Sequence, residues 1–282
     1  AGKEAMKLLI TGSRGTIGTA LRTELEKRGH EVWGLDLQHS ADERYFRCDV
    51  GNFRQLQKVF LRQHFDVVYH LAAEFGRING ELFYDTLWQT NVTGTRNILE
   101  LQHTYGFKLI FASSSEIYGE CEVPILTEDL SGMIPLRQMN DYAMSKYVNE
   151  KQIMNFEARH CNPCVRLRFF NAYGPGEFYH HYRSVCALFC YRALKGLPYE
   201  VYDGYSRAFM FIDDFIPTLE NVCDNFKAGE VYNIGGSEYR SVLELSDIVQ
   251  VVAGSKSKIT YLAEDKHNTV RKRPDNTKAE RD

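Results

Sequence analysis

The chain has 282 residues, which is enough for one large domain, or a large domain with a smaller lobe, around a full hydrophobic core. Hydrophobic residues make up 44% and charged residues 25%, and the net charge of −3 gives no reason to expect nucleic acid or an anionic membrane as a partner. No apolar run reaches membrane-spanning length and no segment resembles a signal peptide, so we expect a cytoplasmic protein.

Taken in chain order, apolar runs typical of strands alternate with stretches of helical spacing. The strand-like runs are Lys7–Thr11, Glu31–Leu37, Phe65–Ala73, Lys108–Ser115, Val165–Asn171 and Val231–Gly235. The helical stretches are Leu21–Arg28, Phe53–Gln63, Asn91–His103, Tyr142–Arg159 and Val242–Ala253. Continuous apolar strands separated by helices predict a parallel sheet covered on both faces, which is a Rossmann-type doubly wound α/β fold.

The regular alternation loosens from about Gly174 onward. Aromatic-rich loops occur there, around Phe178–Tyr182 and Tyr199–Tyr205. We therefore expect a dinucleotide-binding Rossmann domain over residues 1–173 and a smaller substrate-binding lobe over 174–282, with parts of 205–235 returning to the Rossmann sheet. Such a lobe would cover the carboxyl edge of the sheet, where open α/β folds bind their ligands.

Cysteines and short basic runs predict no further chemistry. The seven cysteines are scattered through apolar segments, as expected for reduced, buried thiols. The one CxxC, Cys161–Cys164, lacks a second pair or nearby histidines, so we predict no metal site. The basic cluster Arg271–Arg273 has the pattern of a solvated face.

A glycine-rich loop follows the first predicted strand. Gly12 permits a tight turn, Gly15 lets backbone approach a pyrophosphate, and Gly18 allows close packing of helix on strand. The helix that opens there offers free N–H groups to phosphates. Asp36 ends the second strand, where an acid binds ribose hydroxyls and repels a 2′-phosphate, so NAD is favoured over NADP. The loop residues expected to bind NAD are Gly12, Gly15, Thr16, Ile17 and Gly18.

A tyrosine and a lysine four residues apart form a second motif, Tyr142 and Lys146. They lie on one helical face, where the ammonium and a nearby nicotinamide would lower the pKa of the phenol so that it acts as a base. Tyr147 and Lys151 have the same spacing, so spacing alone decides nothing. Tyr142 is singled out because it follows the serine cluster that ends the Lys108–Ser115 strand.

With these motifs the sequence resembles the extended short-chain dehydrogenase/reductase family, which includes nucleotide-sugar epimerases and dehydratases. The likeness covers nearly the whole chain and includes Thr11–Gly18, Asp36, Asp49-Val50, Leu71–Ala73, Asn91–Thr95, Ser113–Gly119, Tyr142–Lys146, Arg168–Pro175, Arg207–Asp214, Tyr232–Gly235 and Arg273–Asp275. We find no counterpart of the family's final helix before Asp282.

The resemblance implies NAD as cofactor, a nucleotide-diphosphate sugar as substrate, and a homodimer that pairs the helices Asn91–His103 and Tyr142–Arg159. Further cofactor contacts are implied for Asp49, Val50, Leu71, Ala72, Ala73 and Asn91, besides Tyr142 and Lys146. Substrate contacts are implied for Asn171, Arg183, Arg207 and Arg273.

The family mechanism then assigns roles to Tyr142 and Ser114. Tyr142 would remove the proton of the sugar's 4-hydroxyl while C4 gives hydride to NAD, and Ser114 would hydrogen-bond the same oxygen. The resulting 4-ketone can lose water, lose carbon dioxide, or be reduced again on its other face. A non-catalytic alternative is an NAD-binding regulatory module, against which the intact Ser114, Tyr142 and Lys146 argue.

Glu116 and Ser115 discriminate among these outcomes. A glutamate at position 116 matches the 4,6-dehydratases, which use it to take the C5 proton, whereas simple 4-epimerases need none. Many dehydratases have an aspartate in place of Ser115, and decarboxylases tend to have an arginine after Gly174-Pro175, for which Arg183 could substitute. We therefore expect dehydratase-like elimination first, decarboxylation second and 4-epimerisation third.

Overall fold

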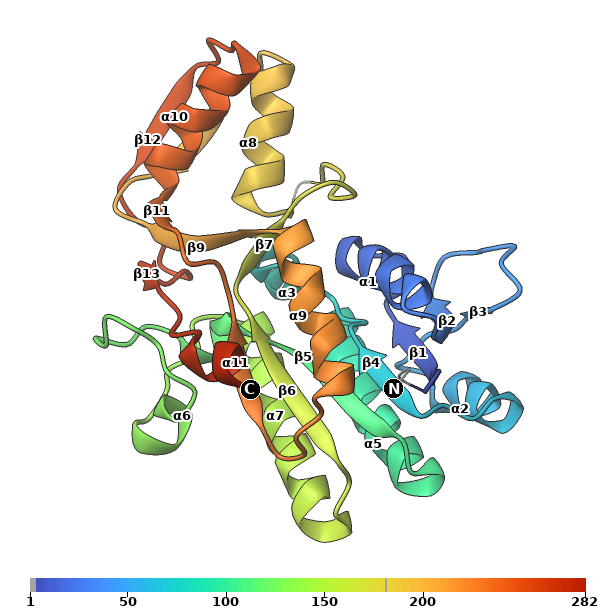
Figure 1. The fold of residues 1–282 in the computed structure, drawn as a ribbon. Helices are drawn as coiled ribbons and strands as arrows, with labels where there is room; N and C mark the ends of the chain where they lie inside the picture. The colour runs from blue at the N-terminus through green and yellow to red at the C-terminus, as the bar shows by residue number, and fades with distance from the viewer. Residues whose placement is uncertain (1–3, 181) are drawn as a thin grey trace.

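The structure, a computed structural model, describes residues 4–180 and 182–282, so His181 of the first aromatic loop lies outside it. In these residues seven parallel strands form the main sheet, in the order β10-β6-β5-β4-β1-β2-β3 (Figure 1). They are β1 (Lys7–Thr11), β2 (Glu31–Asp36), β3 (Tyr45–Arg47), β4 (Val67–His70), β5 (Lys108–Ser114), β6 (Cys164–Phe169) and β10 (Val231–Ile234). The predicted Rossmann-type α/β fold is confirmed.

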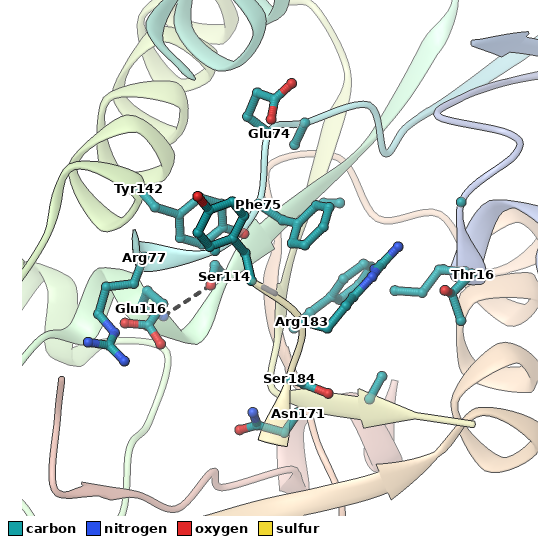
Figure 2. Close-up of a pocket in the computed structure, with 18 of the residues that line it drawn as sticks. Thr16, Glu74, Phe75, Arg77, Ser114, Glu116, Tyr142, Asn171, Arg183 and Ser184 are labelled. Carbon is teal, nitrogen blue, oxygen red and sulfur yellow. Dashed lines mark hydrogen bonds between the residues drawn. The ribbon is translucent and has the colours of Figure 1, made fainter. Parts of the chain in front are cut away.

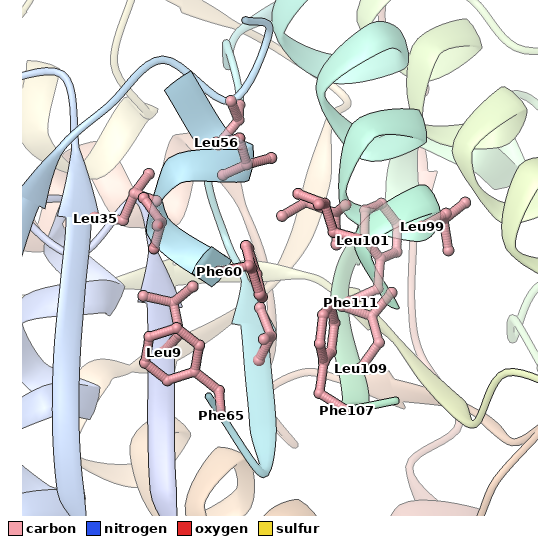
Figure 3. Packing of buried hydrophobic residues seen from close by; sticks show 14 of the residues in the cluster. Leu9, Leu35, Leu56, Phe60, Phe65, Leu99, Leu101, Phe107, Leu109 and Phe111 are labelled. Atoms are coloured by element: carbon pink, nitrogen blue, oxygen red, sulfur yellow. The ribbon is translucent and has the colours of Figure 1, made fainter. Parts of the chain in front are cut away.

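Helices cover both faces of this sheet because its strands are apolar on both sides. In β1, Leu9 packs into one core cluster, while Leu8 and Ile10 pack into the other. The first cluster lies under α2 (Phe53–Arg62), α5 (Gly94–Tyr105) and α7 (Asp141–His160), and Figure 3 shows part of it. The second lies under α1 (Thr16–Lys27) and α9 (Ile212–Asp224).

Two predicted helices differ from the structure at their starts. The predicted Leu21–Arg28 helix begins earlier, at Thr16, directly after the glycine loop. The predicted Asn91–His103 helix begins within a π-helical turn, η1 (Gln89–Thr93), and its remainder belongs to α5, which starts at Gly94. The shorter helices are α3 (Arg77–Leu82), α4 (Tyr84–Trp88), the 3-10 turn η2 (Ser115–Tyr118), α6 (Leu130–Met133) and α11 (Thr277–Arg281).

A smaller lobe lies over one end of the main sheet (Figure 1). Its first small sheet contains β7 (Asn171–Tyr173), β9 (Ser206–Phe211), β11 (Tyr239–Ser241) and β13 (Arg271–Lys272). Its second pairs β8 (Tyr199–Tyr202) with β12 (Ile259–Leu262), beside the packed helices α8 (Val185–Leu194) and α10 (Val242–Ala253). Because β7 follows β6 after one residue, the lobe starts at the carboxyl edge of the sheet. Residues 212–234 leave it again, since α9 packs on α1 and β10 pairs with β6.

Candidate active site

The glycine loop turns sharply between β1 and α1. Gly12 has a φ of +71°, and a Cβ on it would lie 2.8 Å from the backbone nitrogen of Ala72. A Cβ on Gly18 would collide with the carbonyl oxygen of Gly12, so only glycine lets the helix approach the loop this closely. Gly15 is the N-cap of α1 and provides no side-chain cap, which leaves the N–H groups of the first turn for a ligand.

The acid predicted to bind ribose is fixed beside this loop. One carboxylate oxygen of Asp36 accepts a hydrogen bond from the backbone nitrogen of Arg14 at 3.0 Å, and the other accepts one from Leu37 at 2.7 Å. The carboxylate therefore stands at the end of β2, next to the turn that would hold a pyrophosphate. Glycine backbone at one place and a fixed carboxylate beside it fit the two halves of an adenosine diphosphate.

A cavity of about 1410 Å³ runs from the glycine loop to the small lobe. It brings together nineteen of the predicted site residues: Gly12, Gly15, Thr16, Ile17, Gly18, Asp36, Asp49, Val50, Leu71, Ala72, Ala73, Ser114, Ser115, Glu116, Tyr142, Lys146, Asn171, Arg183 and Arg207. These residues come from both the sheet and the lobe, so the cavity has room and polar walls for a cofactor and a substrate together.

Two predicted contacts, Asn91 and Arg273, lie outside the lining of this cavity as far as the described residues define it. Asn91 is buried behind the wall, where its side chain accepts from the backbone nitrogen of Glu74 at 2.8 Å and donates to Ser145 at 3.0 Å. It thus braces the segment after β4. Arg273 is exposed, and its guanidinium stacks over the ring of Tyr239 at 5.8 Å.

Tyr142 and Lys146 enter the cavity from the first turns of α7, which begins after the N-cap Asn140. Figure 2 shows Tyr142 close to Ser114, with which it shares a hydrogen bond. Burial raises the pKa of the Tyr142 phenol, and the Ser114 hydrogen bond opposes that shift. The Lys146 ammonium donates to the carbonyl of Ala112 at 2.8 Å, and its burial lowers its pKa to about 7.

Helix α7 and strand β5 are joined through three contacts. On the helix the residues are spaced by four, so they share one face. The pairs are Tyr142 with Ser114, Lys146 with the Ala112 carbonyl, and Glu150 with Ser113. These contacts hold the tyrosine beside the serine, although 28 positions separate them in the sequence.

Glu116 has a partner that the sequence did not reveal. Its backbone nitrogen donates to the Ser114 hydroxyl at 3.1 Å, and its carboxylate forms an ion pair with the Lys272 ammonium. Lys272 lies on β13, opposite Arg207 of β9, and is buried. The expectation of a solvated face is wrong at this position. Burial, with a smaller contribution from the charge of Arg77, lowers the pKa of Lys272 to about 7.

The arginines that line the cavity include the predicted Arg183 and Arg207, and Arg77, which the sequence analysis missed. Arg183 stacks over the ring of Phe75 at 4.4 Å. Arg207 is buried and donates to the carbonyl of Thr269 at 2.7 Å, and burial lowers its pKa to about 10. These cations suit a substrate that carries phosphates.

The remaining motifs show no separate site. Cys161 ends α7 with a φ of +54°, while Cys164 is buried at the start of β6, where burial raises the pKa of its thiol. Within residues 4–180 and 182–282 no group of three or more His, Cys, Asp or Glu side chains is placed to hold a metal ion. None of the helices described is both long and apolar enough to cross a membrane.

Comparisons with known proteins agree with this geometry. Residues 8–235 match the model of the NAD dependent epimerase/dehydratase family. UDP-N-acetyl-alpha-D-glucosaminuronate decarboxylase from Bacillus cytotoxicus is 32% identical over 269 residues, which cover 91% of this chain and 83% of that protein.

Solved structures give the same result. UDP-glucose 4-epimerase from Thermus thermophilus, in complex with NAD, matches with a TM-score of 0.88 and 26% identity, over 98% of this chain and 92% of the other. MoeE5, in complex with UDP-glucuronic acid and NAD, matches with a TM-score of 0.84 and 26% identity, over 98% and 91%. The fold, the glycine-loop cavity and these matches together show that the chain belongs to the NAD-dependent epimerase/dehydratase family, in which nucleotide sugars are epimerised, dehydrated or decarboxylated.

Proposed function

We propose that the protein is an NAD-dependent decarboxylase of nucleotide-diphosphate hexuronates, which oxidises the sugar at C4 before carbon dioxide leaves. The observation that carries this proposal is the ion pair of Glu116 with the buried Lys272, next to Ser114 and Tyr142. The 32% identity to a decarboxylase of a UDP-N-acetylhexuronate supports the same choice.

The first step of the proposed mechanism is a proton transfer from the sugar. Tyr142 takes the proton of the 4-hydroxyl, and Ser114 hydrogen-bonds the same oxygen as it becomes a ketone. Lys146, held by the Ala112 carbonyl, places a positive charge beside the phenol and stabilises its deprotonated form. NAD, when bound, supplies the hydride acceptor at C4 and later returns the hydride.

The second step breaks the bond between C5 and C6. A carboxylate at C6 is then β to the ketone, so its electron pair can move through C5 to the ketone oxygen as carbon dioxide leaves. The resulting enolate needs one proton at C5. The Glu116–Lys272 pair can deliver it, because Glu116 lines the cavity and its carboxylate contacts the ammonium of the buried Lys272, which can supply a proton through it.

The identity of residue 115 favours this route over loss of water. Elimination of the C6 hydroxyl requires an acid that protonates the leaving oxygen. Ser115 is 4% exposed, and an alcohol is a far weaker acid than the carboxyl group that many dehydratases have there. Decarboxylation needs no such donor. We therefore reverse the order expected from the sequence, in which dehydration came first.

Dehydration stays the second candidate because Glu116 supports it. The carboxylate is placed beside Ser114 and is stabilised by the Lys272 ammonium, so it could also take a proton from C5. The two reactions share the C4 oxidation and differ in the bonds that break next: the C5–C6 bond in decarboxylation, and the C5–H and C6–O bonds in dehydration.

Mass spectrometry of the products tests the proposal. The protein with NAD would be incubated separately with UDP-glucuronate, UDP-N-acetylglucosaminuronate and UDP-glucose, with the Tyr142→Phe variant as the inactive control. Release of carbon dioxide from a uronate is the expected result. Loss of water from UDP-glucose would instead make the protein a dehydratase. A product of unchanged mass with inverted C4 in its NMR spectrum would make it an epimerase.

A further inference from the structure

Arg77 enters the cavity from an unusual local structure. It is the first residue of α3 and follows Gly76, whose φ of +87° turns the chain after β4. Its side chain lines the cavity, and its Nη1 atom forms an ion pair with the buried carboxylate of Asp265 at 2.5 Å. The guanidinium is thus attached to the small lobe, while its backbone belongs to the segment beside the main sheet.

Two other cations lie close to Arg77. Lys272 and Arg207 face each other across β13 and β9, and both have lowered pKa values, mainly through burial and further through the charge of Arg77. Lys272 is engaged by Glu116, and Arg207 by backbone carbonyls such as that of Thr269. Two carboxylates, Asp265 and Glu116, pair with Arg77 and Lys272, whereas Arg207 has no carboxylate partner among the described residues. The positive charges thus exceed the negative ones by one, and this end of the cavity can accept an anion.

Arg77 has hydrogen-bonding capacity left for that anion. Among the described residues, its Nε and Nη2 atoms have no hydrogen-bond partner, since the ion pair with Asp265 uses Nη1. Figure 2 shows the guanidinium beside Glu116, at the same end of the pocket as Ser114 and Tyr142. That is the end where the reacting sugar must lie, because Ser114 and Tyr142 act on its C4 oxygen.

Arg183, which also lines the cavity, lies at its other end. Arg183 stacks over Phe75, and Figure 2 shows its guanidinium directed toward Thr16 of the glycine-loop helix. The carbonyl of Gly176, seven residues before Arg183, accepts a hydrogen bond from Thr16 at 3.1 Å. Arg183 therefore belongs to the phosphate-binding end. On the sequence alone, Arg183 could take the place of the arginine that decarboxylases tend to have after Gly-Pro, but Arg77 is better placed for that role.

We propose that Arg77 recognises the C6 carboxylate of the sugar and so makes the site prefer a hexuronate over a neutral hexose. This assignment rests on the proposed function. A planar guanidinium held by Asp265 can bind a carboxylate through two parallel hydrogen bonds, whereas a C6 hydroxymethyl group offers it no charge.

Binding measurements on the NAD-loaded protein test this assignment without turnover. In a Tyr142→Phe background, the Kd values of UDP-glucuronate and UDP-glucose would be measured by calorimetry, with and without Arg77→Met. The variant should raise the Kd of UDP-glucuronate by at least about tenfold and change the Kd of UDP-glucose by less than about twofold. The reason is that only the uronate loses a charge-assisted contact. The matched control, Arg183→Met, should raise the Kd values of both ligands by the same factor.

Two further variants separate recognition from a structural role. Arg77→Lys should retain part of the preference, because the charge remains and the paired hydrogen bonds do not. Asp265→Asn removes the same ion pair but keeps the guanidinium, so the preference for the uronate should survive. Equal weakening of both ligands by Arg77→Met and by Asp265→Asn would show that Arg77 only ties the lobe to the sheet, and would overturn the assignment.

The outcome for Arg77 can be told apart from the outcome for the reaction. If the preference for the uronate depends on Arg77 but the unmodified protein releases no carbon dioxide, decarboxylation fails while the recognition role stands. If carbon dioxide is released and Arg77→Met leaves the preference intact, the recognition role fails alone. A protein with no preference for the uronate would also refute it.

Discussion

The carboxylate of Glu150 accepts a hydrogen bond from Ser113, with 2.6 Å between the two oxygens, and so ties the helix that carries Tyr142 to the strand that ends in Ser114. Glu150 also binds Arg168 through both carboxylate oxygens, at 3.0 and 2.8 Å. Both side chains are buried. The relative position of Tyr142 and Ser114, the proposed catalytic pair, therefore depends on a buried ion pair beneath them.

Glu150→Gln should destabilise the protein by about 3–5 kcal/mol, because it leaves the buried Arg168 guanidinium without a counter-charge. Urea denaturation followed by circular dichroism would measure the loss. The control is the double variant Glu150→Leu with Arg168→Met, which removes both charges and should recover most of the stability. Equal losses in the single and the double variant would contradict the explanation.

The pKa of Glu150 predicts how the free energy of unfolding depends on pH. Burial opposes ionisation of Glu150, but the hydrogen bonds and charge of Arg168 outweigh it and lower its pKa below the ordinary value of 4.5. A carboxyl group with a lowered pKa contributes its full stability above the unfolded value and loses it as the pH falls through the folded value. Between pH 5 and 3, unfolding free energies should therefore fall more steeply for the unmodified protein than for the double variant.

Tyr142→Phe should reduce kcat by about 10²–10⁴-fold, because it removes the group that takes the sugar proton. Bound NAD should be retained, since the glycine loop and Asp36 are untouched. Product formation and the cofactor content of the purified variant would be measured together. Tyr147→Phe, on the same helix and at the same spacing from a lysine, is the matched control and should keep full activity.

Lys272→Arg should lower kcat by about 10²-fold, because an arginine can keep the ion pair with Glu116 but holds its proton too tightly to pass it on. In the unmodified protein, burial lowers the pKa of Lys272 to about 7, so the ammonium loses its proton as the pH rises through that value and the Glu116 pair can no longer supply one. The alkaline limb of kcat against pH should therefore disappear in this variant. A limb that remains near pH 7 would assign the titration to Lys146, whose pKa burial also lowers to about 7.

Asp36→Asn should weaken the binding of NAD by about tenfold and strengthen the binding of NADP. The reason is that a carboxylate which accepts hydrogen bonds from the ribose hydroxyls also repels a 2′-phosphate. Fluorescence titration with each cofactor would give the two Kd values. Asp49→Asn is the control: this acid also lines the cavity, but its carboxylate accepts from the backbone of Gly51, so the ratio of the two Kd values should not change.

The fold, and the gathering of the expected cofactor residues around one cavity, could be predicted because their signals are local. Strands such as β4 and β5 are apolar on both faces, and the glycine triplet and Asp36 stand at fixed distances from strand ends. Helix α9, which contains Pro217, is not among the helices predicted from the sequence. Its place beside α1 follows from packing across the sheet, which no local pattern encodes.

The substrate half depends on contacts between distant segments, and the sequence predicted it less well. Lys272 is 156 positions from Glu116 and lies on a strand of two residues, inside a run of charges typical of exposed chain. Arg77 follows a loop glycine and belongs to no motif. Arg273, the neighbour that the resemblance selected, is exposed, because alternate residues of a strand point to opposite faces.

The position of β13 along the chain has a consequence for biosynthesis. The last strand of the main sheet, β10, ends at Ile234, whereas Lys272 is added to the chain considerably later. A nascent chain emerging from the ribosome can thus complete its dinucleotide cleft before the residue that pairs with Glu116 exists. The strands and the glycine loop of the cleft are therefore in place in the chain before the ion pair of Glu116 can form.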